Sequence, residues 1–115
     1  MKVLVVDDEP AVRQGLRMSL ALEGEVELVG EAASAREALN LAWQLQPDVV
    51  VMDAVLPDME TIQVARLLHL ILPECKVVVL TLHDTDALQA EARAAGATVC
   101  AKHKGAEDLV ACIKR

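Results

Sequence analysis

Polar side chains that could carry out phosphoryl chemistry follow the apolar runs of this sequence. Asp7 and Asp8 come directly after the first run, Asp53 after a later one and Thr81 after the next, while Lys102 lies near the end of the last. Three carboxylates brought close together repel one another, so a proton or a cation should lie among them. Oxygen ligands without His or Cys favour Mg²⁺ over zinc. The pattern therefore indicates a magnesium site suited to phosphoryl transfer.

Each of these side chains has a role that such chemistry would use. A carboxylate such as that of Asp53 can act as the nucleophile and form an aspartyl phosphate. The Thr81 hydroxyl can donate a hydrogen bond to a phosphoryl oxygen, and a lysine can place a positive charge beside another. Taken singly, each residue also fits a helix cap, a strand end or a solvated surface. Their arrangement at successive strand ends favours the functional interpretation.

The elements that must position these residues alternate five times between strand and helix. Residues 3–6, 49–52 and 77–80 are apolar throughout, as strands buried on both faces are. Residues 26–32 and 98–101 are predicted to complete a set of five strands. Helical segments with apolar stripes follow each strand. This alternation predicts an α/β domain with a parallel sheet and helices on both of its faces.

Helix boundaries are marked by residues with clear capping or breaking preferences. Pro10 suits the first turn of the first helix, and Ser34 with Glu37 forms a capping box for the second. Gly96 supplies a C-terminal stop for the fourth helix, which is predicted to begin at Asp84 or Thr85 and to end at Ala95. In open parallel sheets, ligands bind beyond the carboxyl ends of the strands. The candidate residues would all lie at that edge.

The composition bounds the classes of function. A chain of 115 residues, 54% hydrophobic and 25% charged, is expected to form a single globular domain over residues 1–115. The formal net charge of −7 argues against direct binding of nucleic acid or of an anionic membrane. No apolar run is long enough for a membrane span. The acidic excess is compatible with a cation site or a basic partner.

The cysteines indicate a reducing compartment. Cys75, Cys100 and Cys112 are three in number and have no CxxC spacing, so we expect buried, reduced thiols and neither a disulfide set nor a zinc site. The first predicted strand begins within two residues of Met1, so no signal peptide is expected. A cytoplasmic location follows from both expectations.

Four segments carry a resemblance to a known family. They are V-L-V-V-D-D-E-P (residues 3–10), P-D-V-V-V-M-D-A-V-L-P-D-M (residues 47–59), V-V-V-L-T (residues 77–81) and A-A-G-A (residues 94–97). In their order and spacing the sequence resembles the bacterial two-component response-regulator receiver (CheY-like) family over essentially its whole length. The segment E-L-V-G-E-A-A (residues 27–33) looks like the NarL/LuxR-type subgroup.

The resemblance implies a fold and a set of site roles. The expected fold is the flavodoxin-like, doubly wound five-stranded parallel sheet with strand order 2-1-3-4-5. Asp53 would be the phosphoacceptor. Asp7 and Asp8 would bind Mg²⁺ together with Asp53 and the Val55 carbonyl, and Thr81 would be the switch hydroxyl. Phosphorylation would bias the surface near the fifth strand between two states.

The resemblance also implies partners. The phosphodonor would be a phosphohistidine on a sensor histidine kinase, and a homodimer is an expected assembly. The domain would modify only itself and would not be a turnover enzyme. NarL-type receivers usually precede a helix-turn-helix, DNA-binding output domain, which these 115 residues do not contain. The chain would then be either an excised fragment or a stand-alone regulator.

The lysine of the phosphate site is ambiguous in the sequence. Counting from Gly96, the usual family spacing places His103 where a lysine is expected. Lys102 fits if the fifth strand is one residue short, and Lys104 fits if one residue is inserted. Lys102 is favoured because C-A-K-H then resembles the usual end of the strand.

Other positions depart from the family pattern. Cys100 takes the aromatic switch position on the fifth strand, so the usual coupling of threonine to an aromatic ring cannot operate in its normal form. Leu82 is bulkier than the small residue usual after the switch threonine. Thr61 replaces a common loop glycine, and Asp58 places another acid near the site.

Two functions other than a phosphorylated receiver also fit parts of the sequence. One is a receiver-like interaction module that no longer uses phosphorylation, which the altered fifth strand supports. The other is a Mg²⁺-dependent phosphatase with an aspartyl nucleophile, which the absence of D-x-D after the first strand and of room for a capping insert disfavours.

Overall fold

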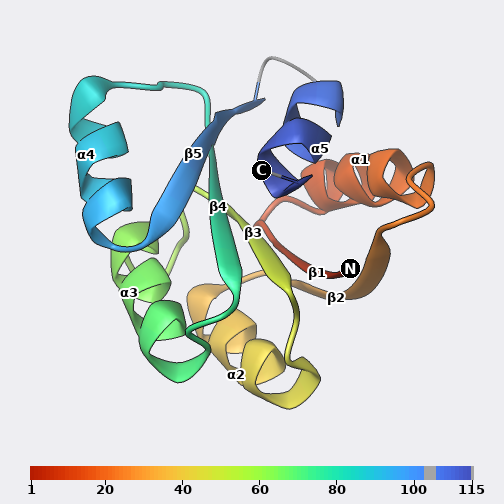
Figure 1. Ribbon diagram of the computed structural model, residues 1–115, viewed down its shortest axis with the longest axis horizontal. Coiled ribbons are helices and arrows are strands. Elements are labelled where there is room, and N and C mark those ends of the chain that lie inside the picture. Colours follow the sequence, from red (N-terminus) through yellow and green to blue (C-terminus); the bar gives the residue numbers. More distant parts are fainter. Residues whose placement is uncertain (103–105, 115) are drawn as a thin grey trace.

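Strands and helices alternate along the whole described chain (Figure 1). The computed structural model describes residues 1–102 and 106–114. In chain order the elements are β1 (Lys2–Val6), α1 (Pro10–Ala21), β2 (Glu27–Ala32), α2 (Ala35–Leu45), β3 (Val49–Asp53), α3 (Thr61–Ile71), β4 (Lys76–Thr81), α4 (Asp86–Ala94), β5 (Ala97–Ala101) and α5 (Ala106–Lys114).

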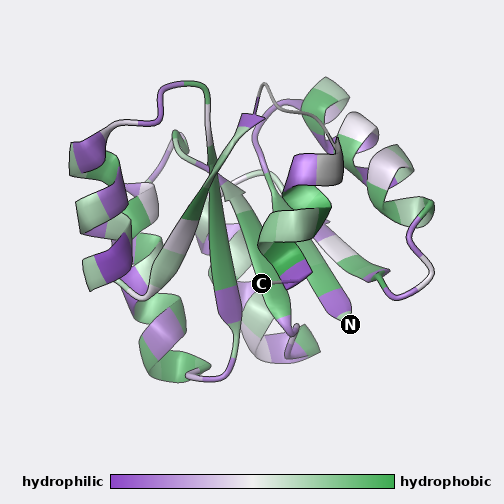
Figure 2. Cartoon of the chain, turned by 45° about the horizontal axis from the view of Figure 1, so that its top comes forward, coloured by the Kyte–Doolittle hydropathy of each residue, from purple (hydrophilic) through white to green (hydrophobic). Residues whose placement is uncertain are grey.

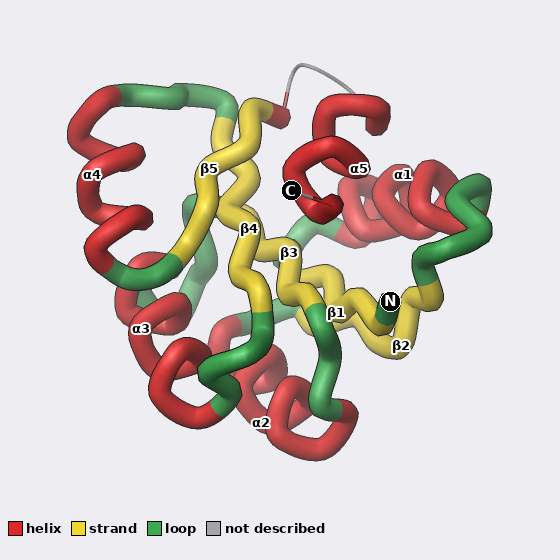
Figure 3. The backbone as a smooth tube through the Cα atoms, viewed as in Figure 1, coloured by secondary structure: helices red, strands yellow, loops and turns green. Residues whose placement is uncertain are grey.

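The strands form one parallel sheet in the order β2-β1-β3-β4-β5. This confirms the predicted doubly wound fold. Helices α2, α3 and α4 lie on one side of the sheet, and α1 and α5 lie on the other (Figures 1 and 3). Because the strands are parallel, their carboxyl ends meet at one edge, where the strands end at Val6, Asp53, Thr81 and Ala101.

The sheet separates two aliphatic cores, and alternate residues of each strand enter different ones. Leu4 and Val6 of β1 pack with α2 and α3, whereas Val3 and Val5 pack with α1 and α5. This is why the strands read as continuous apolar runs. In Figure 2 the central strands are green along most of their length, whereas the helices alternate between green and purple.

The predicted boundaries of the strands and of the fourth helix differ from the observed ones by one or two residues. β5 begins at Ala97, one residue before the predicted start. α4 begins at Asp86 because Thr85 is its N-cap, with the side-chain oxygen accepting a hydrogen bond from the Leu88 N–H at 3.1 Å. Lys104, the alternative phosphate-site lysine, lies outside the described residues.

No helix in the described part of the chain has the length and apolar character needed to cross a bilayer. The cysteines agree with the predicted burial, since Cys75, Cys100 and Cys112 are all buried and none of them forms a disulfide.

Among the glycines that the structure describes, Gly96 should be the least replaceable. Its φ is +80°, and an added Cβ would lie 3.0 Å from His69 Nδ1 on α3. We expect Gly96→Ala to lower the free energy of unfolding by about 1–3 kcal/mol, because it adds backbone strain to a steric clash. Urea unfolding would measure this.

Gly15→Ala is the matched control. Gly15 lies inside α1 with no atom within 4 Å of an added Cβ. Alanine there should raise the free energy of unfolding by about 0.5–1 kcal/mol, because glycine weakens a helix interior. Equal effects of the two substitutions would contradict this account.

Candidate functional site

Acids from two distant segments meet at the carboxyl edge of the sheet. Asp7 and Asp8 directly follow β1, and Asp53 is the last residue of β3. Their carboxylate oxygens, one from each residue, all lie within 4.8 Å of one another. Asp7 is only 1% exposed, whereas Asp8 is exposed and Asp53 is half-buried. A trio of acids this close should hold a cation.

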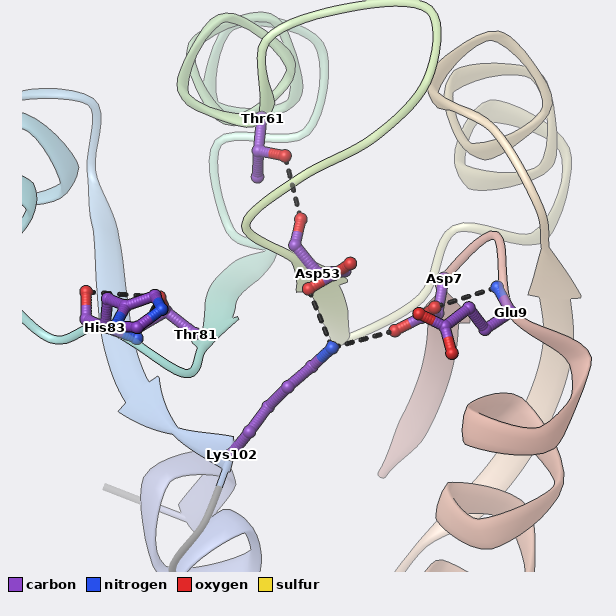
Figure 4. Close-up of polar contacts among 7 residues, drawn as sticks. All are labelled: Asp7, Glu9, Asp53, Thr61, Thr81, His83 and Lys102. Atoms are coloured by element: carbon purple, nitrogen blue, oxygen red, sulfur yellow. Dashed lines mark hydrogen bonds and ion pairs between the residues drawn. The ribbon is translucent and has the colours of Figure 1, made fainter.

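The Lys102 ammonium lies between two of these acids (Figure 4). Its Nζ is 2.8 Å from Asp53 Oδ1 and 3.3 Å from Asp7 Oδ2. Burial would lower the pKa of Lys102, but the hydrogen bonds and charges of Asp53 and Asp7 outweigh burial and raise it. Lys102 is therefore charged at neutral pH and contacts two of the three acids.

The backbone around Asp7 holds its carboxylate in place. Asp7 Oδ1 accepts a hydrogen bond from the Glu9 N–H at 2.9 Å, and the Asp7 carbonyl accepts one from Arg13 at 2.6 Å. Glu9 is the N-cap of α1, with no side-chain capping bond, and Pro10 follows it in the first turn. Asp7 is thus fixed just before the helix, and its second oxygen is left to face Lys102.

Thr81 lies at the end of β4, next to β5, and is 6% exposed. Its hydroxyl donates to the His83 carbonyl at 3.2 Å and accepts from the His83 N–H at 3.0 Å. Figure 4 shows this pair apart from the contacts of Asp53 and Lys102. The hydroxyl is therefore engaged by its own loop.

Thr61 supports the site in a way that the sequence did not reveal. Its hydroxyl donates to the Asp53 carbonyl at 2.8 Å, which joins the first residue of α3 to the end of β3. The Ala54 N–H donates to the Leu80 carbonyl at 2.8 Å and fixes the other side of the turn. In the sequence, Thr61 stands out only as the replacement of a loop glycine. The available signal was a hydroxyl-bearing residue eight positions after Asp53.

Asp58 does not join the acidic cluster, which corrects the expectation that it adds an acid there. Its two carboxylate oxygens accept hydrogen bonds from the Ala35 N–H at 2.8 Å and the Arg36 N–H at 3.1 Å. Ser34 accepts from the Glu37 N–H, as the capping box predicts. The first three N–H groups of α2 are therefore satisfied. The hydrogen bond from the Ala35 N–H, and to a lesser extent that from the Arg36 N–H, lowers the pKa of the Asp58 carboxyl below its ordinary value.

The donor set suits Mg²⁺. Asp7, Asp8 and Asp53 offer hard oxygen ligands within 4.8 Å of one another. One ammonium cannot offset three carboxylates, and Arg13 is directed to a carbonyl and to Glu31, 3.6 Å away. The excess negative charge favours a bound divalent cation. Val55 lies in the loop after β3 and is 75% exposed.

Known proteins share this sequence and architecture. The family model of the response regulator receiver domain matches residues 3–114. The chain belongs to the response regulator receiver domain family. It is the receiver domain of a two-component response regulator, and such domains are generally not turnover enzymes.

Two curated relatives and one solved structure illustrate the similarity. The Bacillus subtilis transcriptional regulatory protein YhcZ is 39% identical over 99 residues, covering 82% of this receiver and 46% of that protein. The Staphylococcus aureus response regulator VraR is 40% identical over 81 residues, covering 70% and 39%. The signal receiver domain of NarL from Mycobacterium tuberculosis is 32% identical with a TM-score of 0.87, covering 98% of this receiver and 95% of that chain. The receiver spans less than half the length of these curated relatives.

Lys102→Met should destabilise the receiver when no divalent cation is present. The substitution leaves Asp7 and Asp53 without their ammonium, and we expect a loss of about 1–2 kcal/mol after solvent screening. Because the pKa of Lys102 is raised in the folded state, this stabilisation is full below the unfolded value of about 10.4 and is lost as the pH rises through the folded value. Urea unfolding at pH 7 and above pH 10 would measure both effects.

Lys114→Met is the control for this charge change. Lys114 pairs at 3.4 Å with Glu25 on the surface. Its loss should cost less than about 1 kcal/mol. If both substitutions lower the free energy of unfolding equally, the contact of Lys102 with Asp7 and Asp53 stabilises the fold no more than a surface ion pair does.

Asp58→Ala should lower the unfolding temperature at pH 7 because α2 loses two capping hydrogen bonds. The pKa of Asp58 is lowered in the folded state, so its stabilisation is present above the unfolded value of about 3.9 and is lost as the pH falls through the folded value. The difference between parent and variant should therefore shrink in acid. Thermal unfolding from pH 7 to pH 3 tests this.

Glu60→Ala removes an equal charge from the same loop, and Glu60 makes no side-chain capping bond. It should leave the unfolding temperature nearly unchanged. A difference for Asp58→Ala that stays constant from pH 7 to pH 3 would rule out the carboxylate cap as its source.

Proposed function

We propose that this receiver is switched by Mg²⁺-dependent phosphorylation of Asp53. The observation that carries the proposal is the convergence of three carboxylates and the Lys102 ammonium at one edge of the sheet. In this proposal Asp7, Asp8, Asp53 and the Val55 carbonyl hold Mg²⁺. When bound, the cation would offset charge on the transferred phosphoryl group.

The proposed step is an in-line phosphoryl transfer. An Asp53 oxygen attacks the phosphorus of a phosphohistidine, so that a P–O bond forms and the P–N bond breaks. The bonding electron pair leaves with the imidazole, which takes up a proton. Water later attacks the acyl phosphate and returns the Asp53 carboxylate and inorganic phosphate. The domain modifies itself and completes no turnover of a separate substrate.

Lys102 and Thr81 would respond to the new phosphoryl group. The Lys102 Nζ, already 2.8 Å from Asp53 Oδ1, would pair with a phosphoryl oxygen. The Thr81 hydroxyl would give up its bond to the His83 carbonyl and donate to another phosphoryl oxygen. Both residues adjoin β5, so phosphorylation would bias that side of the domain between two arrangements.

Partners follow from the same proposal. The phosphodonor is a phosphohistidine on a sensor histidine kinase, and the cytoplasm is the compartment where the two meet. A homodimer is the proposed phosphorylated assembly. Because the relatives YhcZ and VraR are about twice as long as this chain, a helix-turn-helix output domain in a longer protein is part of the proposal.

One observation favours a second function, an interaction module that does not use phosphorylation. Cys100 occupies the switch position of β5, is 2% exposed and donates through Sγ to Asp108 on α5. A small side chain bonded to α5 cannot swing as an aromatic ring does. The fold would then persist as a binding surface without a switch.

Phosphorylation should add the mass of one phosphoryl group to the parent chain. The experiment is intact-mass spectrometry after incubation with acetyl phosphate and Mg²⁺. Asp53→Asn should abolish the adduct, because the amide is not a nucleophile for phosphorus, and so should chelation of Mg²⁺. Asp84→Asn is the matched control, since Asp84 pairs with Gln89 and lies outside the acidic cluster.

Two outcomes would contradict the proposal. No adduct on the parent chain would favour the interaction module. An adduct that survives Asp53→Asn would place the phosphoacceptor elsewhere.

A further inference from the structure

Three side chains with metal-binding atoms meet between β5 and α5, in a cluster separate from the acidic site. They are Cys100 on β5 and Asp108 and Cys112 on α5. One ligand atom from each lies within 4.8 Å of the other two, and Cys100 Sγ is 3.3 Å from Asp108 Oδ2. Cys100 is 2% exposed and Cys112 is 1% exposed.

The packing of α5 on β5 brings these atoms together. Asp108 and Cys112 are four residues apart on α5, so both lie on the same helix face. Cys112 and Leu109 pack in the same core as Cys100. Neither thiol is a ligand candidate of the acidic site, which consists of two carboxylates directly after β1 and one at the end of β3.

The separations agree with tetrahedral coordination. Metal–sulfur and metal–oxygen bonds of about 2.3 and 2.1 Å place a sulfur and an oxygen ligand about 3.6 Å apart. The 3.3 Å between Cys100 Sγ and Asp108 Oδ2 is close to that value. Soft thiolate ligands favour Zn²⁺ or Cd²⁺ and disfavour Mg²⁺. We propose that Cys100, Cys112 and Asp108 form a binding site for a thiophilic divalent cation such as Zn²⁺, with a water molecule as the fourth ligand.

Charge conservation explains how a buried site can accept such an ion. The Cys100 thiol now donates to the Asp108 carboxylate. Burial, and after it hydrogen bonds with Cys112 and Asp108, raise the pKa of Cys100, so without metal this thiol is protonated. On binding, two S–H protons pass to solvent and two metal–sulfur bonds form. The cation adds two positive charges as the protons remove two, so the net charge of the cluster does not change.

Cys75 provides the internal comparison. It is also buried, but it lies directly before β4 and its Sγ contacts the Lys76 carbonyl at 3.6 Å. A buried cysteine of this kind behaves as a small hydrophobic residue. We therefore expect Cys75 to bind no cation, in contrast to Cys100 and Cys112. The proposed site does not depend on phosphorylation at Asp53.

Titration of the reduced chain with Cd²⁺ tests the proposal. The probe is the ultraviolet cadmium–thiolate charge-transfer band, measured with a phosphine reductant that does not compete for metal. We expect one Cd²⁺ per chain, loss of the band in Cys100→Ser and in Cys112→Ser, and an unchanged band in Cys75→Ser. Asp108→Asn should weaken binding by at least about tenfold, because even a residue that only supports a ligand often contributes that much.

A second measurement keeps the test valid if a serine variant fails to fold. X-ray absorption of the Cd²⁺-loaded parent chain should show two sulfur ligands, with oxygen as the remainder. No charge-transfer band, or a shell of oxygen alone, would overturn the site and leave two cysteines that only fill the core. Asp53→Asn should bind Cd²⁺ like the parent, and loss of the band in that variant would also overturn the proposal.

Discussion

Repulsion among Asp7, Asp8 and Asp53 is the constraint around which the carboxyl edge of the sheet is organised. Their oxygens lie within 4.8 Å of one another, and the Lys102 ammonium, 2.8 Å from Asp53 and 3.3 Å from Asp7, offsets part of the charge. Solvent screens the exposed Asp8 more than the buried Asp7. What remains is an excess of negative charge that suits a divalent cation and, with it, a phosphoryl group.

The rest of the fold holds these charges in register. Strands buried on both faces cannot slip without moving apolar side chains out of one core or the other, so the ends of β1 and β3 stay aligned. Hydrogen bonds then fix the loops that leave those ends, from Glu9 to Asp7, from Thr61 to Asp53 and from α2 to Asp58. The loop after Asp53 is therefore joined to both α2 and α3, and a change at the acid can reach both helices.

A buried cysteine joins β5 to α5. Cys100, which the family resemblance predicts to stand at the aromatic switch position, is 2% exposed, and its Sγ donates to Asp108 on α5. Lys102 lies two residues farther along the same strand direction and contacts the acids. Cys100 and Lys102 therefore make two different contacts from one short segment. The Cys100 thiol contacts Asp108 on α5, and the Lys102 ammonium contacts Asp7 and Asp53.

The sequence by itself determined the alternating architecture, the strand ends at Asp7, Asp53 and Thr81 and the receiver resemblance, because burial on both faces and helix caps such as Ser34 are recorded in local residue patterns. The tertiary structure alone decided which distant groups meet. The sequence favoured Lys102 over its neighbours, but it could not show that the ammonium contacts Asp53. That contact depends on the register of β5 against β4. Three other contacts likewise depend on how separate elements pack. They are the hydrogen bonds from α2 to Asp58, from Thr61 to the Asp53 carbonyl and from Cys100 to Asp108. No periodicity within one segment encodes such contacts, because each requires the position of a second segment.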